Sequence, residues 1–221
     1  MKKMYFLFLT VLICSLANAQ ITKGDIILGG NVDYTNSTTT NTGSNTKVKT
    51  RLSNLTIDPS FGKAIKDNLV LGFNIDYTRS TNSSDEPNNG NLTGNGFGAG
   101  VFLRKYIPLG NHFYFFGQTA LSGTYTHSSL HQAAGYQPLT DITNSSAFSL
   151  SFFPGIAYAI NHKWQLETGL ANFFGINYSH SKETATFTGS PAETNTSNYF
   201  SVASELSSSS FLVGVRYFIG N

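Results

Sequence analysis

The sequence has few charged residues and almost no cysteine, and both shortages limit what the protein can be. Only 12% of its 221 residues are charged, whereas 14% are aromatic and 21 are glycine. That balance is unusual for a soluble globular domain. Cys14 is the one cysteine and lies in an N-terminal apolar run, so residues 20–221 predict neither disulfides nor thiolate metal sites. The sequence also has no basic cluster to attract nucleic acid.

The N-terminus has the layout of a secretory signal peptide. Lys2 and Lys3 precede an apolar run at 5–16, and an A-x-A cleavage site occupies residues 17–19. The run is too short to cross a bilayer as a helix. We therefore expect a signal peptide at 1–19 and one exported domain at 20–221. That domain is formally neutral, because without Lys2 and Lys3 it keeps twelve basic and twelve acidic residues.

Four segments alternate apolar with polar residues, reach a tyrosine and continue into Ser, Thr and Asn. Their tyrosines, Tyr34, Tyr77, Tyr125 and Tyr178, are 43, 48 and 53 residues apart. Strict alternation is typical of a strand whose faces meet different environments, and the repetition indicates one sheet. No window has a sustained helical period, so the sequence predicts an all-β protein. We expect eight strands, at about 25–35, 50–62, 69–78, 95–106, 113–126, 146–160, 164–178 and 208–219.

The connections between these strands alternate in length. Those after the second, fourth and sixth strands are short and contain turn residues, while the others are polar and run to a dozen residues or more. This layout is typical of an eight-stranded antiparallel up-and-down transmembrane β-barrel, with short periplasmic turns and long extracellular loops. Pro59 and Pro154 cannot donate ladder hydrogen bonds, so we expect β-bulges near them. Asn172 shares the phase of apolar neighbours, which predicts a bulge there too.

The alternation assigns apolar side chains to the lipid and polar side chains to the interior. We expect opposite charges inside a narrow barrel to pair and hydrogen-bond. Such a network is either a gate or a plug, and the width of eight strands favours a plug. Its predicted members are Asp33, Asp58, Asp76, Arg104, Glu167 and Arg216. Tyr and Trp favour the membrane interfaces, which predicts an aromatic girdle of Tyr34, Tyr77, Tyr125 and Tyr178 on the loop side and Tyr106, Tyr158, Trp164 and Tyr217 on the turn side.

No candidate for catalysis or metal binding has the required pattern. His127 and His131 are four residues apart, a useful spacing on a helix, but their segment is typical of a loop and has no acidic or Cys partner. Ser128, His127 and Asp141 lie in the same predicted loop, where Ser is too abundant for the coincidence to carry weight. We therefore expect no enzyme activity, no cofactor and no metal.

The signal peptide, the eight alternating strands and the aromatic last strand resemble the small outer-membrane β-barrel families, among them OmpA, OmpX and OmpW. The polar loops most resemble the outer-membrane β-barrel domain family common in Bacteroidetes. In that family a proline such as Pro59 or Pro154 lies upstream of a turn such as 64–68 or 159–163. The resemblance implies an outer-membrane location and insertion by the outer-membrane assembly machinery, which reads a last strand such as 214–218.

These observations favour an integral outer-membrane barrel that contacts lipid and displays polar loops for structure or for surface ligands. The alternative is a passive, porin-like channel for small solutes. A soluble lipid carrier of lipocalin type would place apolar residues inside and charges outside, opposite to the expected faces.

Overall fold

The computed structural model describes residues 21–42, 47–85, 90–110, 112–132, 139–170, 173–187, 189–204 and 211–220. Every regular element in this part of the chain is a strand. They are β1 (Ile26–Thr42), β2 (Lys47–Lys66), β3 (Leu69–Ser84), β4 (Asn91–Pro108), β5 (Phe113–Gln132), β6 (Leu139–Ala159), β7 (Trp164–Leu170), β8 (Phe174–Phe187), β9 (Glu193–Ala203) and β10 (Phe211–Ile219).

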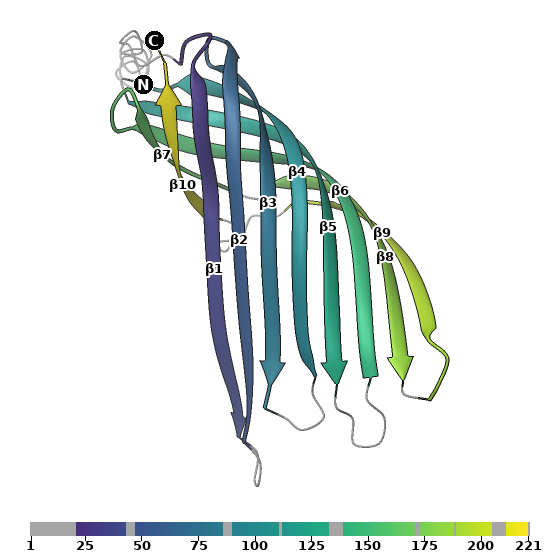
Figure 1. Ribbon diagram of the computed structural model, residues 1–221. Helices are drawn as coiled ribbons and strands as arrows, with labels where there is room; N and C mark the ends of the chain where they lie inside the picture. The colour runs from purple at the N-terminus through teal and green to yellow at the C-terminus, as the bar shows by residue number, and fades with distance from the viewer. Residues whose placement is uncertain are drawn as a thin grey trace, which may run out of the picture.

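Eight strands close an antiparallel barrel, which confirms the predicted fold class. Strands β1 to β6 pair in sequence order, β6 then pairs with β7, β7 with β10, and β10 with the start of β1. The first part of β6, residues 139–152, pairs instead with β8, and β8 pairs with β9. Figure 1 shows β7 and β10 at one end of the molecule and β8 and β9 at the opposite end. We call these the turn side and the loop side.

Short turns join the strands at the turn side. Asn68 follows β2 with a φ of 58°, a left-handed conformation that asparagine tolerates well. The Asn161 side chain accepts hydrogen bonds from the amides of Lys163 and Trp164, at 2.8 and 2.9 Å, and so closes the turn between β6 and β7.

The segment before β1 folds across the turn-side mouth of the barrel. The Ile21 carbonyl accepts a hydrogen bond from Asn68, and the Gly24 amide donates to the Ala64 carbonyl, both at 2.9 Å. The Ile21 side chain is only 5% exposed and belongs to the core. The N-terminal segment therefore covers part of this end of the barrel.

The prediction of long irregular loops is wrong for much of the polar sequence. β1 continues to Thr42 and pairs with β2 as far as Lys47, and β5 and β6 remain paired out to Gln132 and Leu139. Ser, Thr and Asn compete with a ladder only where the backbone lacks strand partners. Here the neighbouring strand supplies them, so the polar repeats extend the sheet on the loop side.

The predicted seventh strand is divided into two strands, β7 and β8, whereas the predicted eighth strand is the single strand β10. The pairing of β6 with β7 ends at Gly155 and Gly169, and its pairing with β8 begins at Phe152 and Phe174, so β7 and β8 are separate strands on the same neighbour. Pro154 lies between these two pairings and has no amide hydrogen for the ladder. The register between β6 and β5 is unbroken at Pro154, so the irregularity lies on the other side of β6, where β7 and β8 pair. Asn172 lies outside the described residues. The sequence did not predict β9, which pairs with β8 through a run assigned to a loop.

The prediction of a bulge at Pro59 is wrong. The register between β1 and β2 is continuous through Pro59, and the register between β2 and β3 is the same on either side of it. The ladder with β3 omits Asp58 and Pro59, while the register shift lies between Ala64 and Lys66. Gly30 lies opposite Pro59, where a Cβ would be 2.7 Å from the Asp58 carbonyl oxygen. Glycine accommodates the proline without a shift.

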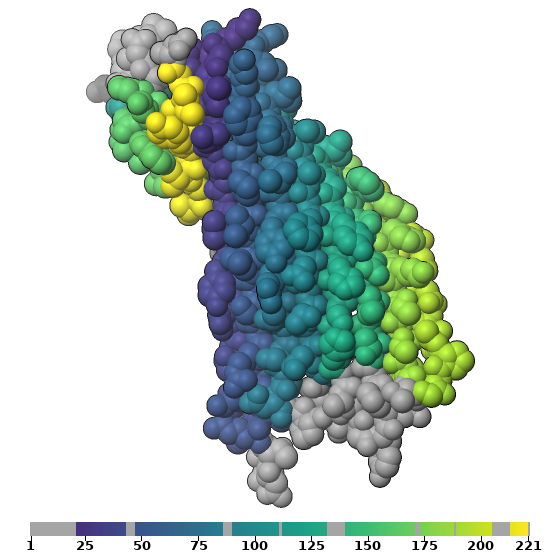
Figure 2. Space-filling view, in the orientation of Figure 1, coloured from purple at the N-terminus to yellow at the C-terminus, as the bar shows by residue number. Residues whose placement is uncertain are grey.

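The outer face of the barrel is apolar over the middle of the strands. Phe73 is 51% exposed and Val213 is 71% exposed, while Arg216 on the same strand as Val213 is buried. This polarity is the reverse of a soluble protein. Strands β1 to β5 form one continuous wall in the space-filling view (Figure 2).

The described residues contain no helix that is long and apolar enough to cross a membrane.

Candidate functional site

The interior of the closed ring contains a buried ion network from three strands. Glu167 on β7 lies between Arg104 on β4 and Arg216 on β10. The Arg216 Nε donates to Glu167 Oε2 at 2.8 Å, and the Arg104 Nη1 donates to the same oxygen. All three side chains are buried. Because one carboxylate serves two guanidinium groups, the network keeps a net charge of +1.

Neutral groups accept further hydrogen bonds from both arginines, while the buried Nη2 of Arg104 has no partner among the described residues. The Arg104 Nε donates to Gln118 at 2.8 Å, and its Nη1 also reaches the Tyr106 hydroxyl at 3.2 Å. The guanidinium carbon lies 4.3 Å from the centre of the Phe116 ring, a cation–π contact. The Arg216 Nη1 donates to Ser60 Oγ at 3.0 Å. The network thus joins β2, β4, β5, β7 and β10 across the lumen.

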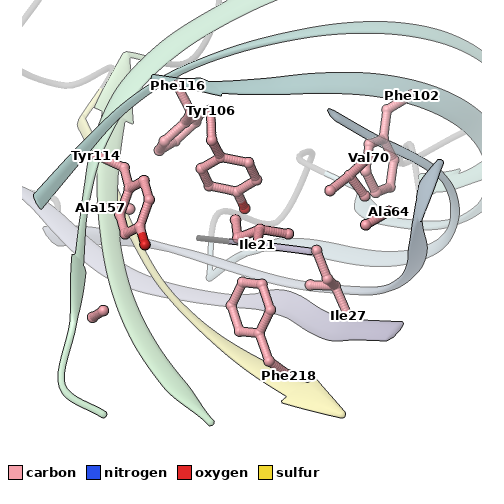
Figure 3. Close-up of a cluster of buried hydrophobic side chains, with 11 residues drawn as sticks. Ile21, Ile27, Ala64, Val70, Phe102, Tyr106, Tyr114, Phe116, Ala157 and Phe218 are labelled. Atoms are coloured by element: carbon pink, nitrogen blue, oxygen red, sulfur yellow. The ribbon is translucent and has the colours of Figure 1, made fainter. Parts of the chain in front are cut away.

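An aromatic core fills the barrel between the ion network and the turn side. Tyr106 packs on Tyr114 and Phe116, with ring centres 5.9 Å apart in both pairs. Figure 3 shows Tyr106, Tyr114 and Phe116 from neighbouring strands, with Ile21 and Phe218 below them. The barrel interior is therefore filled at this level, as expected for eight strands. We call the ion network and this aromatic core the plug.

The placement of Tyr106 in the turn-side girdle is wrong. Its side chain is 1% exposed and lies inside, next to Arg104. On β4 the outer residues are Val101, Leu103 and Lys105, so Tyr106 has the inner phase. Phe102, Tyr114 and Phe116 were not predicted as core residues, although their alternation with outward side chains carried that signal.

The remaining girdle residues lie on the outer face. Tyr34, Tyr125, Tyr158, Trp164 and Tyr178 are exposed. Tyr77 is half-buried against Phe97, an exposed outer residue, with ring centres 5.1 Å apart. Tyr217 likewise packs on Trp164 at 4.9 Å. The outer aromatic residues thus lie at both edges of the apolar wall, towards the loop side and towards the turn side.

The three predicted aspartates share the inner face but take no part in the ion pairs of the described residues. Asp58 accepts a hydrogen bond from Asn74 at 2.9 Å, and Asp33 accepts one from Thr35 at 3.4 Å. The Asp76 carboxylate lies over Gly98, where a Cβ would clash with it. The prediction that these aspartates pair with the arginines is wrong, because they lie nearer the loop side than the plug.

A pocket of about 440 Å³ lies at the turn-side mouth. Its lining includes Ile21, Asp25, His112, Gln165 and Phe218. The Gln165 side chain is buried, and its Oε1 has no hydrogen-bond partner among the described residues. The plug separates this pocket from the loop-side lumen.

The residues considered for catalysis are not assembled into a catalytic group. His127 and Ser128 are consecutive residues of β5, which is strand here and not the predicted loop, so they face opposite sides. His127 Nδ1 is 2.8 Å from Asn144 Oδ1, and Asp141 lies opposite Leu130. Within the described residues no group of three His, Cys, Asp or Glu side chains could hold a metal ion.

The strand pairing and the reversed polarity define the class: a closed, eight-stranded antiparallel barrel with an apolar outer wall and a charged plug. Among solved structures, it is similar to the outer membrane protein OprG from Pseudomonas aeruginosa, with a TM-score of 0.48 and 13% sequence identity over 90% of this chain and 98% of that chain. No family model and no curated protein matches the sequence. The class therefore rests on the pairing and on the polarity of the two faces.

Proposed function

We propose that the protein is an integral outer-membrane barrel with a structural or surface-interaction role and no enzyme activity. The observation that carries the proposal is the apolar outer wall, in which large hydrophobic side chains such as Phe73, Val101 and Leu121 are about half exposed. Such a surface is costly in water and favourable against hydrocarbon. We assign it to the Bacteroidetes outer-membrane family that its sequence resembles, exported by a signal peptide cleaved after Ala19 and inserted by the assembly machinery.

In this proposal the rigid part is the plugged ring, and the displayed part is the loop-side sheet. The strand ends there are rich in Ser, Thr and Asn, as at 38–42. Neutral polar strands offer many hydrogen-bonding groups without a net field. They suit contact with surface ligands or simple coverage of the membrane.

The test is the migration of the membrane fraction on SDS gels with and without boiling. A barrel inserted in the membrane should run faster unheated, because the closed ring resists detergent, and should shift on boiling. A protein that stays in the soluble fraction, or that runs identically in both samples, would overturn the proposal.

A passive channel for small solutes is the second candidate. The observation that favours it is the row of carboxylates on the inner face, with Asp33, Asp58 and Asp76 leading from the loop side towards the plug. Such a lining would attract cations. The plug opposes this function, because the lumen behind the aspartates is filled by Arg104 and Phe116.

A further inference from the structure

A row of cationic and amide side chains crosses the outer wall directly beyond its loop-side aromatic residues. Strand pairing aligns five residues from five neighbouring strands, each opposite the next. The adjacent row towards the turn side contains Tyr77, Phe97 and Tyr125 in register. The five residues of this basic row are Arg79, Asn95, His127, Asn144 and Lys182.

Within the described residues, hydrogen bonds engage the side-chain oxygens of the two amides and leave their NH₂ groups without a partner. The Tyr77 hydroxyl donates to Asn95 Oδ1 at 3.1 Å, and the Tyr125 hydroxyl donates to Asn144 Oδ1 at 2.8 Å. His127 Nδ1 is also 2.8 Å from Asn144 Oδ1. With the carbonyl oxygens engaged, each amide presents its NH₂ group outward. The basic row therefore presents mainly hydrogen-bond donors.

The same arrangement recurs one hairpin further along the chain. The Tyr178 hydroxyl donates to Asn198 Oδ1 at 3.0 Å, and His180 Nδ1 lies 2.9 Å from that oxygen. In sequence, a basic residue follows each of three repeated tyrosines: the second residue after Tyr77, Tyr125 and Tyr178 is Arg79, His127 and His180, respectively. The repeat thus places a basic side chain two residues after the tyrosine on three successive outgoing strands. On β8 this residue, His180, is level with Tyr125, and Lys182 is the member of the basic row.

Within the described residues, no carboxylate neutralises the basic row. Neither Arg79 nor Lys182 takes part in an ion pair of the described chain. Asp85 is on the outer face, but it is bound to Arg51 at 3.0 Å. The carboxylates within the described strands all have the inner phase: Asp33, Asp58, Asp76, Asp141, Glu167, Glu183 and Glu193.

We propose that the basic row binds the anionic phosphates of lipid headgroups in the leaflet on the loop side. This inference rests on the proposed membrane location. The aromatic row marks the depth at which hydrocarbon meets headgroups, and the basic row comes one residue pair beyond it. Phosphate oxygens are acceptors, which matches a row of donors. Arg79, His127 and Lys182 lie on every second strand, about 10 Å apart, so each can hold a separate phosphate.

The test uses the full-length protein in neutral detergent, titrated with short-chain phosphatidylglycerol or phosphatidylcholine and followed by native mass spectrometry. Wild-type protein should prefer phosphatidylglycerol. The double variant Arg79→Gln/Lys182→Gln should lose about 25-fold in affinity for it, about fivefold for each cation removed. Its affinity for phosphatidylcholine should stay unchanged.

The matched control is Lys47→Gln/Lys49→Gln, which removes the same charge from the outer face. Lys49 lies six residues beyond Leu55, the neighbour of Arg79 in register, or about 20 Å away. The control should keep its phosphatidylglycerol affinity within about twofold. An equal loss in both variants, or no loss in Arg79→Gln/Lys182→Gln, would refute a specific row.

Inorganic phosphate added alone distinguishes a lipid site from a site for the free ion. Displacement of phosphatidylglycerol by equimolar phosphate would refute the lipid assignment. Migration on unboiled gels separates the two hypotheses: a variant that still shifts on boiling remains a folded barrel, so its lipid result bears only on the basic row. A wild-type protein that never shifts would instead refute the proposed function.

Discussion

At the scale of single residues, Arg104 carries the largest share of the plug. It contacts Glu167, Gln118, Tyr106 and the Phe116 ring from one buried position. We expect Arg104→Ala to lower the free energy of unfolding by about 3–5 kcal/mol, the usual cost of breaking a buried pair by removing one partner. Denaturant unfolding in detergent micelles measures this. Lys105→Ala, the next residue but on the outer face, should change stability by less than about 0.5 kcal/mol.

Two glycines differ in what a methyl group would meet. A Cβ on Gly155 would clash with the Phe116 ring and lie 2.5 Å from the Thr168 carbonyl oxygen, whereas on Gly175 the nearest atom is 3.9 Å away. We expect Gly155→Ala to cost about 1–3 kcal/mol through overpacking. Gly175→Ala should be neutral or slightly stabilising. Equal stability of the two variants in the same unfolding assay would contradict the packing described for the plug.

At the scale of elements, the outer ends of β6 and β8 bring two carboxylates together. Glu183 lies opposite Thr143, which makes it a diagonal neighbour of Asp141 on the inner face. The interaction with Asp141, by hydrogen bond and by charge, raises the pKa of Glu183. Because the folded state then holds its proton more tightly than the unfolded state, this contribution stabilises pairing at low pH. It is lost as the pH rises through the raised pKa.

We therefore expect backbone amides of 140–144 and 182–186 to be better protected in mild acid than at neutral pH. Hydrogen exchange, corrected for the intrinsic pH dependence, measures this protection. Glu183→Gln should remove the pH dependence, while Glu193→Gln on β9 serves as the control. A pH profile that is the same for Glu183→Gln and wild type would exclude the Asp141 interaction as its cause.

The sequence predicted correctly which side chains face the barrel interior, but not how far along the barrel axis each of them lies. A period of two assigns each side chain to one side of a strand, and Arg104, Glu167 and Arg216 are inside as that period requires. It does not say how far along the barrel a residue lies. Asp58 and Asp76 have the same phase as the arginines but a different level, so they do not pair. Tyr106 was assigned to the girdle by residue type, although its phase pointed inward.

Strand ends were the other weak point, because composition and pairing disagreed there. Residues 193–198 are polar, yet β8 offers the whole run 193–203 a ladder and it becomes β9. The break beside Pro154 was the kind of irregularity that proline predicts. The break itself lies on the neighbouring strand. Its position there depends on how the two strands are aligned, which cannot be inferred from the sequence of one strand.

At the scale of the whole molecule, the plug determines whether solutes can pass. We expect the wild-type protein to be silent in planar bilayers, since Arg104, Phe116 and Tyr106 fill the closed ring. Replacing two of them, in Arg104→Ala/Phe116→Ala, should open a small, cation-preferring conductance past the inner aspartates. Leu121→Ala, on the outer wall, is the control and should remain silent. A conducting wild-type protein would favour the channel function instead.

The two halves of the sheet also differ in their mechanics. Within the described residues, β1 beyond Gly30 pairs with β2 alone, and β9 pairs with β8 alone. The ring on the turn side acts as a collar of fixed circumference, because widening it would break ladder bonds. The loop-side half has two free borders and can curl or flatten with every ladder intact. Hydrocarbon offers backbone groups no hydrogen-bond partners. A bilayer therefore favours the curled form, in which the two free borders lie close together, whereas water tolerates the flattened form.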